Sequence, residues 1–324
     1  MHELAKRLID RDMRALARGI SHFENDHPDK LEILKAVHDQ GKGAHIIGIT
    51  GSPGAGKSSL VNRLIQFLRS KKMTVGIVAV DPTSPFSGGA LLGDRVRMAD
   101  HFTDAGVYIR SMGTRGSLGG LARTTKEAVR LMDAYGFDVI LVETVGVGQS
   151  ELDIMKVADT TAVVLNPGSG DVVQVFKAGI MEIADLFIIN KADLPGVSKL
   201  MTEIEGMLDL VKHDAEWRPP IAQTISTQNK GLKELWDRFK EHGQYLKDSG
   251  EGKRKQTRIL QEEVLEVVHY ELMRLIEKEN EKGSWREQIA RREIDPYTAA
   301  DTILSEWTQR RNPSESQDTT TKEG

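Results

Sequence analysis

The chain has 324 residues, a formal net charge of −4, no cysteine and 39% hydrophobic residues. Without cysteine it has no disulfides or thiolate metal sites, and its charge gives no sign of nucleic-acid binding. No apolar run approaches the about 18 residues of a membrane-spanning helix, and the first residues lack the apolar stretch of a signal peptide. We therefore expect a cytoplasmic protein that binds neither membrane nor nucleic acid.

The first 43 residues are predicted to form a helical extension. Apolar side chains recur at the spacing of a helix between residues 4 and 20, and a second short helix is expected between residues 31 and 37. Glycines at positions 41 and 43 are typical of a helix end. We therefore expect residues 1–43 to be helical and to precede the first strand.

Residues 44–248 alternate between strand-like and helix-like patterns. Together with the phosphate-binding loop described in the next paragraph, this alternation predicts a P-loop GTPase domain. Several strand candidates are nearly continuous apolar runs, the pattern expected when helices cover both faces of a parallel sheet. The sequence therefore predicts an α/β fold with a doubly wound, mainly parallel sheet. The expected strands are 45–50, 75–80, 107–111, 138–143, 160–165, 185–190 and 221–225.

A phosphate-binding loop follows the first of these strands. Residues 51–58 read Gly-Ser-Pro-Gly-Ala-Gly-Lys-Ser, and a helical pattern comes next. In this context backbone N–H groups can curl around a phosphate chain, Lys57 can reach the β- and γ-phosphates, and Ser58 can offer its hydroxyl to Mg²⁺. The predicted phosphate-binding residues are Gly51, Ser52, Pro53, Gly54, Ala55, Gly56, Lys57, Ser58 and Ser59.

Carboxylates after two further strands are candidates for the metal and the reaction. Glu143 ends a predicted strand and Gly146 follows it, as in Ras-like proteins, where a carboxylate holds Mg²⁺ through water and a glycine N–H senses the γ-phosphate. Mg²⁺ takes few protein ligands and keeps several waters. We therefore place Ser58 and then Asp94 closest to the metal and Glu143 on a metal-bound water. Asp81 is expected to orient the attacking water or accept its proton.

A second nucleotide motif, at residues 190–193, reads Asn-Lys-Ala-Asp and follows an apolar run. The carboxylate of Asp193 can accept two hydrogen bonds from the edge of guanine, whereas adenine offers no such pair of donors. Lys191 can lie across the base with its aliphatic stem, and Asn190 can tie this loop to the phosphate loop. The sequence therefore predicts a GTPase that binds GTP or GDP with Mg²⁺, and its predicted catalytic residues are Lys57, Asp81 and Glu143.

The end of the chain is predicted to be a helical arm, residues 249–311, followed by a disordered polar tail, residues 312–324. After a polar break at 249–255, a long helix is expected over about 256–282. Its apolar residues cover more than one face, so we expect it to pack on a second subunit as well and to form a homodimer. Asp295-Pro296 is typical of the cap and first residue of a last helix.

Further motifs lie between the two nucleotide elements in a fixed order. They read Asp-Pro-Thr-Ser-Pro at 81–85, Gly-Gly-Ala-Leu-Leu-Gly-Asp-Arg-Val-Arg-Met at 88–98, Gly-Ser-Leu-Gly-Gly at 116–120, Glu-Thr-Val-Gly-Val-Gly-Gln-Ser-Glu at 143–151 and Gly-Ser-Gly-Asp-Val-Val-Gln at 168–174. Together they closely resemble the MeaB/ArgK family of P-loop GTPases, which includes the human methylmalonic aciduria type A protein. The resemblance covers essentially the whole chain.

The resemblance implies a GTP-dependent chaperone of an adenosylcobalamin-dependent acyl-CoA mutase, typically methylmalonyl-CoA mutase. Such a chaperone gates cofactor loading, protects or reactivates the mutase, and usually dimerises. The resemblance also marks residues 166–177 as a third switch loop, in which Gln174 and Lys177 are expected to face the partner, and it implies a switch role for Gln149. Ser226 and Thr227 are expected to close the guanine pocket, where a backbone N–H can bond the guanine carbonyl.

Other functions remain open from the sequence. A metallochaperone GTPase shares this fold class, but the chain has no cysteine, and its histidines at positions 2, 22, 27, 38 and 45 show no metal-ligand spacing. An ArgK-type kinase or ATPase linked to amino-acid transport is opposed by the guanine chemistry of Asp193. A scaffold with a purely structural nucleotide is the remaining alternative, and nucleotide turnover distinguishes it.

Overall fold

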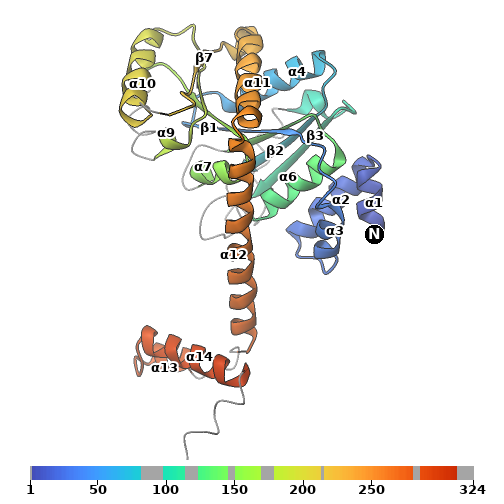
Figure 1. Cartoon of the computed structure of the whole chain (residues 1–324), viewed down its shortest axis with the longest axis vertical. Helices are drawn as coiled ribbons and strands as arrows, with labels where there is room; N and C mark the ends of the chain where they lie inside the picture. The colour runs from blue at the N-terminus through green and yellow to red at the C-terminus, as the bar shows by residue number, and fades with distance from the viewer. Residues whose placement is uncertain are drawn as a thin grey trace, which may run out of the picture. The chain divides into compact units, whose positions relative to one another are not determined.

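The computed structural model of the chain describes residues 2–81, 98–113, 123–144, 150–168, 179–212, 215–279 and 285–311. Contacts within the chain form two compact units, Met1–Lys253 and Arg254–Gly324. The first unit contains the sheet and the candidate site (Figure 1). No helix in the described part of the chain is long and apolar enough to cross a membrane.

A parallel sheet forms the centre of the first unit. Among the described residues it has seven strands in the order β3-β2-β4-β1-β5-β6-β7, and all neighbours run parallel. The predicted fold class is confirmed, and each predicted strand is present with ends that differ by no more than two residues. The strands are β1 (His45–Gly51), β2 (Val75–Asp81), β3 (Val107–Gly113), β4 (Val139–Thr144), β5 (Thr160–Leu165), β6 (Leu186–Ile189) and β7 (Ile221–Gln223).

The two faces of the sheet receive alternate side chains from the same strands, because successive residues of a strand point to opposite sides. Val78 of β2 and Val142 of β4 pack with α6 on one face. Their neighbours Ile77 and Leu141 pack with α4 and α11 on the other. A further cluster joins α10 to β5 and β6. These helices are α4 (Lys57–Ser70), α6 (Arg123–Tyr135), α10 (Val197–Val211) and α11 (Leu232–Asp248).

Helices of the N-terminal extension pack on α6 (Figure 1). They are α1 (Glu3–Ile9), α2 (Met13–Glu24) and α3 (Lys30–Val37). The apolar pattern between residues 4 and 20 therefore belongs to two helices and not to one, so that prediction was wrong. The chain turns at Arg11, whose φ is 64°, and the carboxylate of Asp12 then accepts hydrogen bonds from the N–H groups of Arg14 and Ala15 at 2.9 and 3.3 Å. This capping restarts the helix.

The C-terminal helices are α12 (Glu251–Glu279), α13 (Trp285–Ala290) and α14 (Pro296–Arg311). The predicted break at 249–255 is shorter than expected, since α12 begins directly after Gly250, which has a φ of 70°. The charged residues that suggested a break are good helix formers. Asp295 caps α14 as predicted, with its Oδ1 accepting from Tyr297 N at 2.8 Å. The short helix α13 was not predicted.

Shorter elements lie in the connections between the strands. They are η1 (Ala99–His101), α7 (Ser150–Asp153), η2 (Ile154–Lys156), α9 (Ile180–Ile183) and η3 (Ser226–Gln228). In a parallel sheet the carboxyl ends of the strands share one edge, and ligands bind outside that edge. The loops that follow β1, β6 and β7 therefore converge there.

Candidate functional site

The phosphate loop after β1 has a backbone that side chains would disrupt. Gly51, Gly54 and Gly56 have φ values of 128°, 77° and 87°, the region that favours glycine. A Cβ on Gly51 would lie 2.1 Å from Val164 O, and one on Gly56 would lie 2.6 Å from Asn190 Nδ2. The glycines of the motif are therefore required by the close approach of β5 and of the guanine motif to the loop.

The first turn of α4 faces the concave side of this loop. Gly56 caps the helix without a side-chain acceptor, and the N-terminus of a helix favours an anion because its first N–H groups point toward that end. Lys57 is buried, and its Nζ donates to the carbonyls of Gly51 at 2.7 Å and Ser52 at 3.0 Å. An ammonium group and a helix N-terminus thus meet where a phosphate chain is expected.

Ser58 and Glu143 come together beside the loop. The hydroxyl of Ser58 donates to Glu143 Oε1 at 2.7 Å, and Glu143 is only 2% exposed. The pairing of β1 with β4 produces this contact, because it places Ile49 opposite Glu143. A hydroxyl and a carboxylate oxygen form a donor set that suits Mg²⁺. The predicted pair of metal-binding oxygens is therefore brought together by the fold.

Asn190 joins the phosphate loop to the guanine motif. It is 1% exposed, and its Nδ2 donates to Ala55 O at 2.9 Å. Its Oδ1 accepts from Thr224 Oγ1 at 3.1 Å and from Ser226 Oγ at 2.8 Å. One buried amide therefore connects the loops after β1, β6 and β7. The role predicted for Asn190 matches this geometry, whereas Thr224 was not among the predicted residues.

The rest of the guanine motif lies in the same loop. Lys191 has a φ of 56°, and its Nζ donates to Gly54 O at 2.8 Å, so its stem spans the gap between the two motifs. The side chain of Asp193 is exposed. A hollow of about 290 Å³ adjoins this region, and its walls come from α4 and η3. Its lining residues are Ser58, Ser59, Asn62, Arg63, Ser226 and Thr227.

Glu151, at the start of α7, is a further acidic residue at the site. Its side chain is buried, and burial raises the pKa of its carboxyl above the ordinary 4.5, while the positive charge of Lys57 opposes that rise. Sequence reasoning read Glu151 only as part of a family motif and gave it no role. Nothing in the local sequence shows that its side chain turns toward Lys57.

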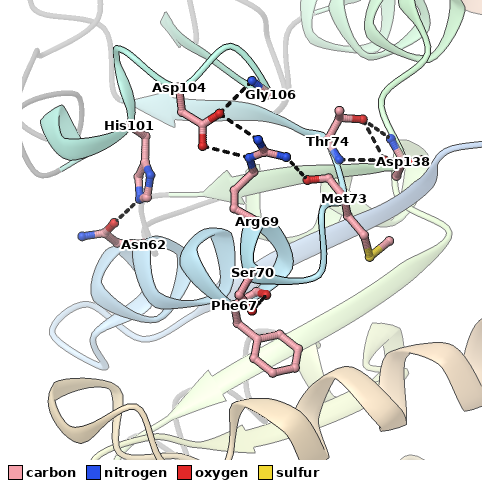
Figure 2. Close-up of polar contacts among 10 residues, drawn as sticks. All are labelled: Asn62, Phe67, Arg69, Ser70, Met73, Thr74, His101, Asp104, Gly106 and Asp138. Carbon is pink, nitrogen blue, oxygen red and sulfur yellow. Dashed lines mark hydrogen bonds and ion pairs between the residues drawn. The ribbon is translucent and has the colours of Figure 1, made fainter.

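Contacts in Figure 2 hold the segment 98–106 against α4. His101 Nε2 donates to Asn62 Oδ1 at 2.6 Å, one turn along the helix from the phosphate loop. Arg69 donates from Nε and a terminal nitrogen to the two carboxylate oxygens of Asp104, at 2.8 and 2.9 Å. A Cβ on Gly106 would lie 2.3 Å from that guanidinium. The chain is therefore anchored to α4 directly after the segment that contains Asp94.

Several predicted residues fall outside the described part of the chain. They are Asp94, Gly146, Gln149 and residues 169–177 with Gln174 and Lys177. Asp81 is the last residue of β2, opposite Gly113 of β3, and only its backbone is described. Its position at the carboxyl end of the sheet agrees with the predicted location.

Comparison with known proteins identifies the family. Residues 16–281 match the family described as "Methylmalonyl Co-A mutase-associated GTPase MeaB". The chain belongs to the MeaB family. A Pyrococcus abyssi protein named as a GTPase is 50% identical over 310 residues, covering 94% of this chain and 96% of its own. The Escherichia coli GTPase ArgK is 35% identical over 243 residues, covering 72% of this chain and 73% of its own.

Another MeaB-family relative is the mouse protein named "Methylmalonic aciduria type A homolog, mitochondrial". It is 34% identical over 336 residues, covering 94% of this chain and 78% of its own. Among solved structures, an LAO/AO transport system kinase superposes with a TM-score of 0.68 at 24% identity, covering 95% of this chain and 97% of the other. That likeness supports the fold. The family resemblance inferred from the motifs is confirmed, and this MeaB-family protein is a P-loop GTPase.

Proposed function

We propose that this GTPase acts as a nucleotide-dependent chaperone of an adenosylcobalamin-dependent acyl-CoA mutase such as methylmalonyl-CoA mutase. The link through Asn190, which joins the phosphate loop and the guanine motif into one site, supports the nucleotide-dependent part of the proposal. The description of the family as mutase-associated supports the choice of partner. In this role the GTPase gates loading of the cobalamin cofactor and protects or reactivates the mutase.

We propose that Asp193 selects guanine and that Lys57 stabilises the transferred phosphoryl group. The exposed carboxylate of Asp193 can accept the paired donors of guanine, while Lys191 spans from the base region to Gly54. Lys57 lies at the N-terminus of α4, where negative charge on the phosphates is favoured. Asp81 is proposed to act on the attacking water.

We propose Mg²⁺ as the bound metal. The buried contact between Ser58 and Glu143 supplies a hydroxyl and a carboxylate oxygen next to the phosphate loop, and Mg²⁺ prefers such oxygen donors. Ser58 would contact the ion and Glu143 would hold a water on it, with Asp81 and Asp94 completing the acidic surroundings. When bound, Mg²⁺ neutralises charge on the phosphates.

We also propose a role for the third switch loop and a mode of assembly. Residues 166–177 are proposed to report the nucleotide state to the mutase, since a ligand drives a partner only through different affinity for its two states. We also propose that the chain forms a homodimer through residues 249–311. A cytoplasmic location stays a prediction, which cell fractionation would test.

GTP turnover with and without a purified adenosylcobalamin-dependent mutase tests the chaperone function. We expect slow basal hydrolysis that the mutase accelerates, and Lys57→Ala should lose turnover in both conditions. Lys177→Ala should reduce the stimulated rate more than the basal rate. Absence of stimulation by any such mutase would overturn the proposed partner, and equal proportional effects of Lys177→Ala would overturn the role of residues 166–177.

The same assay separates the alternative functions. An ArgK-type ATPase would turn over ATP in preference to GTP, and a scaffold with a structural nucleotide would turn over neither. A metallochaperone for a mutase-independent pathway would show no response to the mutase while still hydrolysing GTP. We expect GTP turnover, no comparable ATP turnover, and a response to the mutase.

A further inference from the structure

A group of histidines lies at one end of the N-terminal extension, far along the chain from the nucleotide motifs. His2 precedes α1, His22 is on α2, and His27 and Asp29 lie in the connection to α3. One ligand atom each from His22, His27 and Asp29 can be chosen so that all lie within 4.8 Å of one another. The sequence spacing of these histidines gave no sign of a metal site, and the turn between α2 and α3 brings the three groups together.

The carboxylate of Asp29 is central to the group. Its Oδ2 lies 3.6 Å from His27 Nδ1 and 3.5 Å from His2 Nε2. The rings of His22 and His27 stack with their centroids 4.0 Å apart. Tetrahedral zinc has Zn–N and Zn–O bonds of about 2.0–2.2 Å, which separates its ligand atoms by about 3.3–3.5 Å. The 3.6 Å separation of Asp29 Oδ2 and His27 Nδ1 is already close to that spacing, and the ligand atom of His22 lies within 4.8 Å of the others.

Hydrogen bonds set the ring tautomers in a way that suits a metal. The N–H of Leu4 donates to His2 Nδ1 at 3.2 Å, so the proton of the neutral His2 ring is on Nε2, which faces Asp29. The N–H of Asp29 donates to His27 Nδ1 at 3.2 Å, so that nitrogen carries a lone pair. A metal on His27 Nδ1 uses this lone pair and displaces only an exposed backbone contact. His2 can then orient the carboxylate through Nε2–H, as outer partners of metal sites do.

His22 supplies the third ligand atom, which lies within 4.8 Å of those of His27 and Asp29. Among the described residues, His22 Nδ1 is buried with no hydrogen-bond partner, and such groups call for a compensating contact.

We propose that His22, His27 and Asp29 form a binding site for one Zn²⁺-like divalent ion, with His2 as a positioning residue for Asp29. Two imidazole nitrogens and one carboxylate oxygen are typical zinc ligands, and a water completes such a site. Mg²⁺ prefers oxygen ligands and does not compete well for imidazoles. The ion would hold together the segments before α1, in α2 and before α3.

This site would brace the extension against the sheet. Besides the packing of α2 on α6, α2 carries Glu24, which pairs with Arg110 of β3, and Ser21, whose Oγ accepts from Arg110 at 3.1 Å. An ion that binds only the folded extension raises the free energy of unfolding by RT ln(1 + L/Kd), where L is the free ion concentration. Zinc should therefore raise the melting temperature of the protein.

Calorimetric titration of the full chain with Zn²⁺ tests the proposal. The protein is stripped with a chelator and kept in Mg²⁺ and GDP, so that the oxygen donors near Ser58 are occupied. We expect one equivalent of Zn²⁺ to bind, and Co²⁺ in its place to show the absorption of a low-symmetry nitrogen and oxygen site. His27→Gln should weaken Zn²⁺ binding by more than the about 10–100-fold typical of losing an outer partner.

Asp29→Asn is a second variant that preserves the fold, since the Asp29 side chain makes no capping hydrogen bond to α3. It should also lose the site and the zinc-dependent rise in melting temperature. The matched control is His38→Gln, because His38 is an exposed histidine that follows α3 in the same extension. Absence of stoichiometric Zn²⁺ binding by the parent chain, retention of the site in both variants, or an equal loss in His38→Gln would each overturn the proposal.

Discussion

Asn190 shows how a single side chain can control a whole site. Its amide, in the loop after β6, makes hydrogen bonds to the loops after β1 and β7 and is almost fully buried. Removing it leaves hydroxyl groups of Thr224 and Ser226 without their acceptor, and buried polar groups that lose a partner cost about 1–3 kcal/mol. We expect Asn190→Ala to lower the free energy of unfolding by about 2–3 kcal/mol and to weaken GDP binding at least about tenfold.

Chemical denaturation and calorimetry with GDP measure the two effects of Asn190→Ala. Gln228→Ala is the matched control, because Gln228 is exposed in the neighbouring η3. The control should change neither quantity. An Asn190→Ala protein with unchanged GDP affinity would show that the phosphate loop and the guanine motif act independently.

Asp193 determines the choice of base in the proposed site. In Asp193→Asn a carboxylate acceptor becomes an amide that presents a donor to the donors of guanine. The loss of a charge-assisted pair of hydrogen bonds is worth roughly 2–4 kcal/mol, so GTP affinity should fall by that amount. Xanthosine triphosphate, which offers an acceptor in place of the exocyclic amine, should gain relative to GTP. Calorimetry with both nucleotides measures this exchange, and unchanged GTP affinity would refute the guanine assignment.

Site residues that belong to contiguous motifs could be predicted from the sequence. Site residues that are brought together from distant segments could not. The phosphate loop and the guanine motif each consist of a few consecutive residues, so their roles could be predicted from the sequence alone. Thr224, Glu151 and the group around Asp29 gain their positions only from folding, through bonds across 34 positions in the case of Thr224 and Asn190. Single-sequence patterns hold no record of such contacts.

At the scale of elements, a polar chain links strand and helix at the edge of the sheet where β1 and β5 begin. His45 Nε2 lies 2.8 Å from Thr160 Oγ1, and that hydroxyl lies 2.7 Å from His242 Nδ1 of α11. The other side of His242 faces Asp185, at 3.6 Å. Trp217 packs on His242 and donates to the carbonyl of Asp185 at 2.8 Å. The network therefore ties α11 to the start of two central strands.

Protonation of His45 should loosen this network. Burial, with the charges of His242 and Lys247, lowers the pKa of His45 from 6.5 to about 4. Because the folded-state pKa lies below the unfolded value, the stabilisation is complete above pH 6.5 and is lost as the pH falls toward 4. The loss should not exceed about 3 kcal/mol. We expect His45→Gln, which keeps a hydrogen-bonding group but does not titrate, to reduce this pH dependence.

Denaturation monitored by the fluorescence of Trp217 and the other tryptophans, at a series of pH values, measures the effect of His45→Gln. His38→Gln serves as the control, because His38 is exposed and its removal should leave the pH profile unchanged. Equal pH profiles for the parent chain and His45→Gln between pH 4 and 6.5 would assign the acid sensitivity to other groups.

Patterns of apolar residues predicted the strands well because each buried strand is continuous in the sequence. They predicted helix boundaries less well. One apolar pattern near the N-terminus continued across the turn at Arg11. The backbone of Arg11 is left-handed, and the periodicity of apolar residues does not reveal this. The start of α12 was predicted too late in the chain. Residues 251–255 are polar and suggested a break, but they are helical.

At the scale of the whole molecule, α12 carries the surface most relevant to assembly. Val264, Leu265 and Val268 are 62%, 71% and 56% exposed in the single chain. Large apolar side chains that are exposed together often mark protein–protein interfaces. We therefore expect a homodimer in which α12 contributes to the contact, as the sequence also predicted.

Replacing both Val264 and Leu265 by glutamate should convert the dimer to a monomer, because burying two carboxylates in an apolar contact is unfavourable. Light scattering at micromolar concentration measures the mass, and basal GTP turnover should remain, since neither residue belongs to the nucleotide site. Glu262→Lys is the matched control on the same helix, because Glu262 is also exposed and polar; it should stay dimeric. A parent chain that is monomeric under these conditions would contradict the proposed assembly, and a dimer that survives both glutamates would place the contact away from this part of α12.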